Sequence, residues 1–99
     1  MKPDKKQEQV QAFIKIKEVR TDAKEITALV KESDMVIGYQ LCDGSIVSKE
    51  EGVLLAKLRK INGVGIAINK GIEYLKSLPD VKKTKKIENL PTILDVKIN

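Results

Sequence analysis

Histidine and tryptophan are absent from this 99-residue chain, and cysteine occurs once, as Cys42. A zinc site needs about four Cys or His ligands, or three with a water, so the sequence excludes that class of metal centre. The lack of histidine also excludes a serine or cysteine nucleophile that a histidine activates. Cys42 has no second cysteine for an internal disulfide, and we interpret it as an unreactive thiol beside a turn.

Aromatic residues are scarce, since Phe13, Tyr39 and Tyr74 are the full set. The core must therefore be aliphatic. Few rings are left as platforms on which bases stack, which argues against binding of single-stranded nucleic acid by stacking.

Long apolar runs are also missing. No segment approaches the roughly 20 apolar residues that span a bilayer. Residues 1–10 are polar where a secretory signal would be apolar. These absences favour a cytoplasmic protein and predict no membrane association.

Charge, in contrast, is plentiful. Lysine and arginine number 19 against 14 aspartates and glutamates, which gives a formal net charge of +5. A surplus of this size attracts polyanions at long range but does not identify a partner. A solvated basic surface is the favoured explanation.

The pattern along the chain divides it into three parts. Residues 1–9 are charged and lack apolar spacing, which predicts a flexible basic arm. Residues 10–79 are predicted to form a single α+β domain. Residues 80–99 comprise a lysine-rich loop and an apolar tail, and docking of that tail on the domain would avoid a sticky exposed patch.

The first two predicted elements differ in how clearly the spacing of their apolar residues indicates a structure. Residues 12–16 alternate in polarity, which predicts a strand that ends by Arg20. Residues 22–33 are ambiguous, because strand-forming residues coincide with apolar positions at helical spacing. Asp22 and Glu25 resemble a capping box, so we favour a helix. The alternative is a strand followed by a hairpin turn at residues 32–34.

A hairpin and a capped helix follow. Residues 35–41 and 45–48 are β-rich and flank Asp43-Gly44, a step that accepts the positive φ of a tight turn. Ser48 stands three residues before Glu51, which predicts a helix that starts there and runs to about Lys60.

That helix carries an apolar stripe that should bury against the sheet. Leu54, Leu58 and Ile61 are spaced i, i+4 and i+7, with Leu55 on the flank. Gly63 is predicted to take the left-handed conformation just past the helix end.

The remaining pattern completes the predicted fold. Residues 64–69 are nearly all apolar, which predicts a central return strand. Ile72, Leu75 and Leu78 predict a final helical turn or two that ends at Pro79. The fold class is therefore α+β, with a small three- to four-stranded, largely antiparallel sheet packed by two to three helices.

Reactive constellations are not recognisable. Asp34 and Asp43 are isolated, and Glu50 and Glu51 belong to a helix start, so capping and solubility explain them better than a metal or acid–base site. The glycines at residues 63–65 follow a helix and open a strand, whereas a dinucleotide-binding loop has the opposite order. We therefore predict no catalytic residue, no metal, no cofactor and no enzymatic activity.

Two sets of basic and polar residues are candidate binding sites. A nucleic-acid surface would use the outer face of the predicted helix with the later lysine run, that is Lys49, Lys57, Arg59, Lys60, Lys82, Lys83, Lys85 and Lys86. A pocket for a small anionic, nucleotide-like ligand would use Arg20, Asn69 and Lys70.

Several phrases make the chain resemble a family of small bacterial and phage proteins catalogued as a domain of unknown function. These are VRTD at 19–22, LCDGSIVSKEEGVLLAK at 41–57, INGVGIAINKGIEYLKSLPD at 61–80 and ENLP at 88–91. The chain differs in a longer segment before the Asp43-Gly44 turn and in the lysines before Leu90-Pro91. The resemblance implies a small intracellular α+β domain and assigns no site residues.

Three functions follow from these observations. The first is a protein-binding or regulatory accessory module, reached because no reactive group is evident. The second is non-specific nucleic-acid binding through the lysines. The third is a pocket that sequesters a small anionic ligand. The expected partner is another protein, nucleic acid is an alternative partner, and the oligomeric state is open.

Overall fold

Two β-sheets, one α-helix and two short 3-10 helices make up the computed structural model, which describes residues 12–16 and 18–94. The strands are β1 (Ala12–Lys15), β2 (Ile26–Glu32), β3 (Met35–Leu41), β4 (Ile46–Ser48), β5 (Val64–Asn69), β6 (Ile72–Ser77) and β7 (Thr92–Leu94). The helices are α1 (Lys49–Lys57), η1 (Lys83–Lys85) and η2 (Ile87–Asn89).

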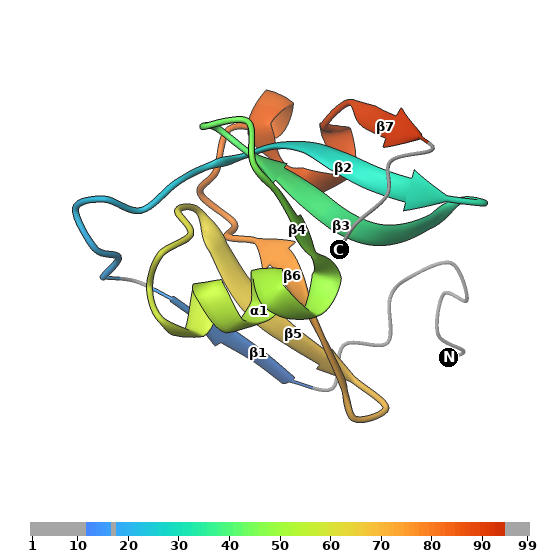
Figure 1. The fold of residues 1–99 in the computed structure, drawn as a ribbon. Helices are drawn as coiled ribbons and strands as arrows, with labels where there is room; N and C mark the ends of the chain where they lie inside the picture. The colour runs from blue at the N-terminus through green and yellow to red at the C-terminus, as the bar shows by residue number, and fades with distance from the viewer. Residues whose placement is uncertain (1–11, 17, 95–99) are drawn as a thin grey trace.

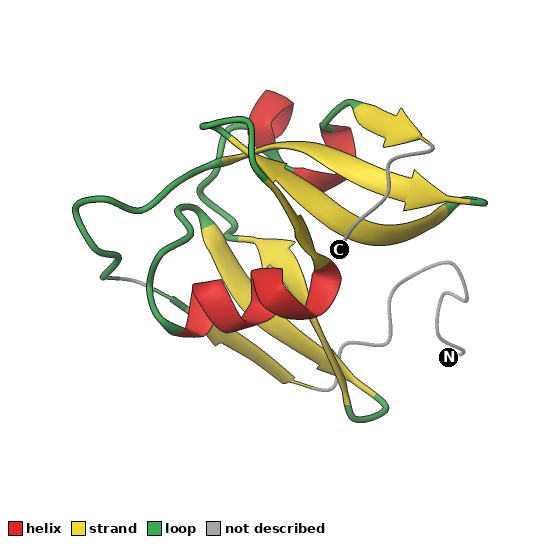
Figure 2. Cartoon of the chain, viewed as in Figure 1, coloured by secondary structure: helices red, strands yellow, loops and turns green. Residues whose placement is uncertain are grey.

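The sheets have the strand orders β1-β5-β6 and β4-β3-β2-β7. All neighbouring strands are antiparallel except β2 and β7, which are parallel. Helix α1 lies across the first sheet and also packs against β3 of the second (Figure 1). The fold is α+β, as predicted, but the strands of the described chain form two sheets where one was predicted, and they are joined by one α-helix where two to three helices were predicted (Figure 2).

The predicted helix at residues 22–33 is wrong, and the alternative is confirmed. Ile26–Glu32 forms β2, which turns into β3 through Ser33 and Asp34, both with positive φ. Two successive positive φ angles are typical of the tight turns that match the twist of a hairpin. Leu29 and Val30 are both buried although they are successive residues of a strand and so point to opposite faces of β2.

The Asp43-Gly44 turn is confirmed. Gly44 has φ +89, and Asp43 Oδ1 accepts hydrogen bonds from Ser45 Oγ at 2.6 Å and Ser45 N at 3.0 Å. These two bonds, the hydroxyl first, hold the pKa of Asp43 below its ordinary value. The turn sets the register in which β4 pairs with β3.

The predicted helix start is also confirmed, because Glu51 N donates to Ser48 Oγ at 3.0 Å. The helix ends earlier than predicted, with Leu58 as its C-cap residue. Arg59, at φ +63, takes the left-handed position predicted for Gly63. Gly63 is also left-handed, but it lies in the turn that leads to β5.

The predicted apolar stripe of α1 faces the wrong way. Leu54 and Leu58 are 56% and 50% exposed, whereas Gly52, Val53 and Ala56 are buried. Small residues let the helix backbone approach the sheet closely, and the larger leucines are left on the outer side. Ile61 is buried, but it lies beyond the helix.

Tyr39 of β3 lies at the centre of this packing. Its ring contacts the α1 backbone at Gly52, and only 2% of the residue is exposed. Burial, with a smaller effect of the nearby Glu50 charge, raises the pKa of Tyr39 to about 12 despite hydrogen bonding to the Leu75 backbone.

The strand predicted at residues 64–69 is confirmed as β5, the central strand of its sheet. The helical turns predicted after it are wrong, because Ile72–Ser77 forms β6 and pairs with β5. Lys70 and Gly71 both have positive φ and close this hairpin. Of the residues whose spacing predicted a helix, Leu75 is buried and Ile72 is 60% exposed. Leu75 and Ser77 lie on the same face of the strand, and both are buried.

The segment after β6 returns to the second sheet. The lysine-rich part predicted as a loop contains η1, and η2 follows it. Thr92–Leu94 forms β7 and pairs with Leu29, Val30 and Lys31 of β2. The predicted arm at residues 1–9 lies outside the described residues. No helix in the described part of the chain is long and apolar enough to cross a membrane.

Candidate functional site

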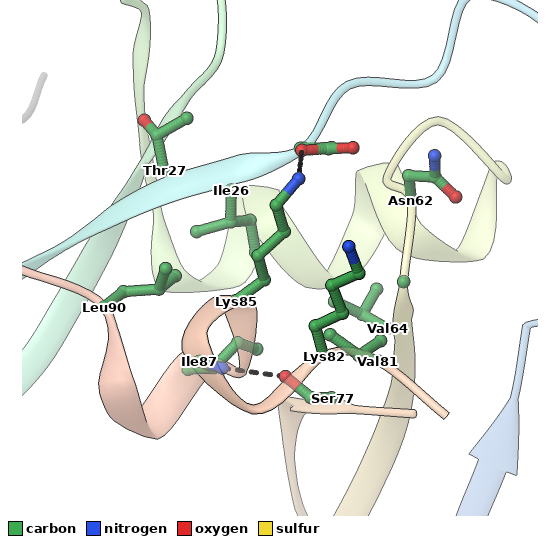
Figure 3. Close-up of a pocket in the computed structure, with 12 residues that line it drawn as sticks. Ile26, Thr27, Asn62, Val64, Ser77, Val81, Lys82, Lys85, Ile87 and Leu90 are labelled. Atoms are coloured by element: carbon green, nitrogen blue, oxygen red, sulfur yellow. Dashed lines mark hydrogen bonds and ion pairs between the residues drawn. The ribbon is translucent and has the colours of Figure 1, made fainter. Parts of the chain in front are cut away.

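A pocket with a volume of about 470 Å³ opens where the two sheets meet (Figure 3). Three parts of the chain surround it: the start of β2, the turn into β5, and the segment that follows β6. Its lining residues are Glu25, Ile26, Thr27, Asn62, Gly63, Val64, Ser77, Val81, Lys82, Lys85, Ile87 and Leu90. The volume lies in the range of about 300–1,000 Å³ that is usual for pockets that hold small molecules.

Apolar side chains line the inner part of this pocket. Ile26 and Val64 are buried members of the core, and Ile87 and Leu90 pack against that core. Val81 contributes a further branched side chain. Together these residues offer a surface that favours the apolar part of a ligand.

Polar and cationic groups lie at the rim. Lys82 and Lys85 come from the 3-10 segment, and their side chains extend in the same direction in Figure 3, towards the side of the pocket formed by Asn62 and the start of β2. Lys85 Nζ lies 3.9 Å from Glu25 Oε1, and both side chains are more than half exposed. An exposed pair at this distance is worth at most about 1 kcal/mol, so it is easily exchanged for another anion.

Lys82 carries a charge that the fold does not use. No hydrogen bond or ion pair joins its ammonium group to any residue in the described part of the chain. A lysine in this state can bind an incoming anion without breaking an existing contact.

A single buried hydroxyl fixes the wall of the pocket. Ser77 is 9% exposed, and its Oγ accepts a hydrogen bond of 2.8 Å from Ile87 N, which attaches η2 to the end of β6 (Figure 3). Lys86 Nζ donates to the carbonyl oxygens of Leu78 and Pro79, which holds the preceding turn. Hydrogen bonds therefore hold the segment that follows β6 at two places, at the turn of Leu78 and Pro79 and at the start of η2.

A second pocket, of about 660 Å³, lies between β2, β3, β6 and η2 and is lined by Lys31, Met35 and Lys49 among others. Ser77 and Ile87 line both pockets, so their hydrogen-bonded contact is part of the partition between them.

The predicted nucleic-acid residues lie in several different surroundings. Lys57 Nζ is 2.8 Å from Glu73 Oε1 of β6, and Lys86 is bonded to backbone carbonyls. Lys82 and Lys85 line the first pocket, and Lys49 lines the second. Three further members, Arg59, Lys60 and Lys83, are exposed. Nucleic-acid binding stays a prediction.

The three residues of the predicted anionic-ligand pocket, Arg20, Asn69 and Lys70, come from different parts of the first sheet and its connections. Arg20 N donates to Arg59 O near the end of α1, and its guanidinium group pairs with Asp22. Asn69 and Lys70 lie at the far end of β5. Five steps along that strand separate this end from Val64, a distance of roughly 16 Å. Binding of an anionic ligand at these three residues stays a prediction.

Sequence reasoning missed the apolar residues of the pocket and Ser77. Ile26, Val64 and Ile87 are far apart in the chain, and each has the pattern of an ordinary core residue. Ser77 offers a weak signal, as a hydroxyl at a buried strand position that needs a hydrogen-bond partner. Lys82 and Lys85 were identified, but for a different ligand.

The thiol-bearing residue Cys42 is not among the residues that line the pocket. Cys42 is exposed next to the Asp43-Gly44 turn. Among the described residues, no three Cys, Asp or Glu side chains are grouped closely enough to hold a metal ion.

Comparison with known proteins identifies a family that includes this chain. A family model described as a protein of unknown function (DUF3892) matches residues 13–91, which confirms the resemblance found in the sequence. No curated protein matches the chain. No solved structure matches it either. The matched range includes every residue that lines the first pocket.

Proposed function

We propose that this chain, which belongs to the DUF3892 family of proteins of unknown function, is a non-enzymatic binding module. Its ligand is a small molecule with an apolar body and an anionic group, held in the pocket between the two sheets. The observation that supports this function most is the placement of Lys82 and Lys85 at the rim of a pocket with an apolar interior.

The two parts of the pocket select two parts of a ligand. Ile26, Val64 and Ile87 would cover an aliphatic or aromatic body, which gains about 25 cal/mol for each Å² removed from water. Lys82 and Lys85 would receive a carboxylate, phosphate or sulfonate. The net charge of +5 would add long-range attraction for such a molecule.

We propose binding rather than catalysis because two polar groups of the pocket, Ser77 and Glu25, already have partners within the protein. The buried hydroxyl of Ser77 is engaged with Ile87 N. Glu25 is exposed and paired with Lys85. A general base or nucleophile needs a group that is free to reach the substrate.

The test uses a pair of fluorescent probes that differ in charge. Anilinonaphthalene sulfonate combines an apolar body with an anion, and N-phenylnaphthylamine is a neutral relative. We expect the sulfonate to bind, and the double variant Lys82→Ser/Lys85→Ser to weaken its binding about 5- to 30-fold, as expected for losing two contacts of about 0.5–1 kcal/mol each. Binding of the neutral probe should change little.

Lys83→Ser is the matched control, because Lys83 is in the same 3-10 helix but does not line the pocket. Glu25→Gln removes the negative charge at the rim and should tighten sulfonate binding. The proposal would be wrong if the folded protein bound neither probe, or if Lys83→Ser weakened sulfonate binding as much as the double variant does. Near-ultraviolet circular dichroism checks that each variant stays folded.

A further inference from the structure

The outer face of α1 carries apolar residues that the fold does not bury. Leu54 is 56% exposed and Leu58 is 50% exposed. Glu51, Leu54 and Leu58 are spaced i, i+3 and i+7, so they lie along one side of the helix. This side is away from the first pocket, whose lining includes no residue of α1.

Opposite charges lie at the two ends of this helix face. Glu50 and Glu51 are exposed in the first turn. Arg59 and Lys60 are exposed just after the C-cap residue. Arg20 lies near this end, because its backbone N–H donates to Arg59 O at 2.8 Å, but its guanidinium group is paired with Asp22. From its N-terminal to its C-terminal end, the face therefore carries acidic, then apolar, then basic residues.

We propose that α1 is a homodimer interface, in which the outer face of α1 packs antiparallel against α1 of a second copy around a twofold axis. An antiparallel pair places the acidic end of each helix beside the basic end of the other. Leu54 and Leu58 of the two copies then meet in the middle. A twofold contact uses the same patch on both copies, so one self-complementary face is sufficient.

The size of the face sets the strength of this contact. A helix of 9 residues is about 13 Å long. A contact of that length falls in the small class of interfaces, below about 1,200 Å² in total, which is typical of weak association. The dimer should therefore form at high protein concentration and dissociate on dilution.

The first experiment is sedimentation velocity over a concentration series from about 10 µM to about 1 mM, the range in which a weak contact of this size is populated. The average mass should rise towards that of a dimer. Leu54→Ser/Leu58→Ser should abolish the rise. Met35→Ser is the matched control, because Met35 is 68% exposed but lies at the β2–β3 turn, and this variant should associate as the unchanged protein does.

The second experiment uses charge reversal. Glu51→Lys alone and Arg59→Glu alone should each stay monomeric, because like charges then meet at both ends of the pair. An equimolar mixture of the two variants should form a heterodimer, since each contact then joins a lysine or arginine to a glutamate. A protein that stays monomeric throughout the series would overturn the proposal. So would a mixture that associates no better than its components, or a leucine variant that associates normally.

Discussion

Replacement of Gly52 by alanine tests how closely α1 packs on the sheet. A Cβ atom at this position would lie 2.7 Å from Cδ2 and 2.8 Å from Cε2 of Tyr39. The Tyr39 ring is buried between the helix and the core, so it has little room to move. In an exposed helix, alanine in place of glycine stabilises by about 1 kcal/mol. Here we expect overpacking to cost about 2–3 kcal/mol, which leaves a net destabilisation of about 1–2 kcal/mol.

The free energy of unfolding is measured by urea titration and the melting temperature by heating, both followed by far-ultraviolet circular dichroism. For a domain of this size, the expected loss lowers the melting temperature by roughly 5–15 °C. A double-mutant cycle with Tyr39→Leu isolates the cause, because the ring is then absent and Gly52→Ala should be neutral or stabilising. An alanine variant that is as stable as the unchanged protein in the presence of Tyr39 would refute the packing described for α1.

Three further changes test other parts of the structure. Ser77→Ala leaves the Ile87 amide without its acceptor, so it should lower the free energy of unfolding by about 1–3 kcal/mol in urea titration and also weaken binding of the sulfonate probe. Because the pKa of Tyr39 is about 12 when folded and 10.0 ordinarily, the unfolded phenol loses its proton first as pH rises. The contribution of Tyr39 is therefore complete below pH 10 and should be lost between pH 10 and 12, by about 2–3 kcal/mol relative to Tyr39→Phe in parallel unfolding titrations. Val53→Ala should cost about 2 kcal/mol in urea unfolding, whereas Leu54→Ala should cost less than about 1 kcal/mol, because only Val53 is buried.

The features that the sequence predicted correctly depend on a few neighbouring residues. Asp43-Gly44 closes its turn through hydrogen bonds to Ser45, two residues away from the aspartate. Ser48 caps α1 through the amide of Glu51, three residues on. Such bonds form in any context that leaves the local backbone free to adopt the turn or the helix start, so the residue pattern is sufficient.

The failures concern segments in which the apolar spacing fits two structures. The residues of β2 fit a helix or a strand, and pairing with β3 on one edge and β7 on the other decides in favour of the strand. One of these partners, β7, pairs with β2 from more than 60 positions later in the chain. No window of sequence around residue 26 contains this information.

The candidate pocket was beyond prediction for the same reason. Its apolar wall joins Ile26, Val64 and Ile87, which the fold brings together from three separate parts of the chain. The lysines at its rim were recognisable as a basic run, but a run of charge gives no indication of an adjacent cavity. The sequence could therefore identify cationic residues and could not identify the ligand class.

Leu54 and Leu58 lie on the outer side of α1 and are not needed to dock the helix on the sheet. Gly52, Val53 and Ala56 supply the buried face, so the helix docks on the sheet without the two leucines. Half-exposed leucines contribute only part of the burial energy that fully covered ones provide, about 1.5–3 kcal/mol each. Serine or a charged residue at either position would serve the fold nearly as well. The contacts that these leucines make within the chain therefore do not require leucine at both positions, whereas the proposed contact with a second copy would.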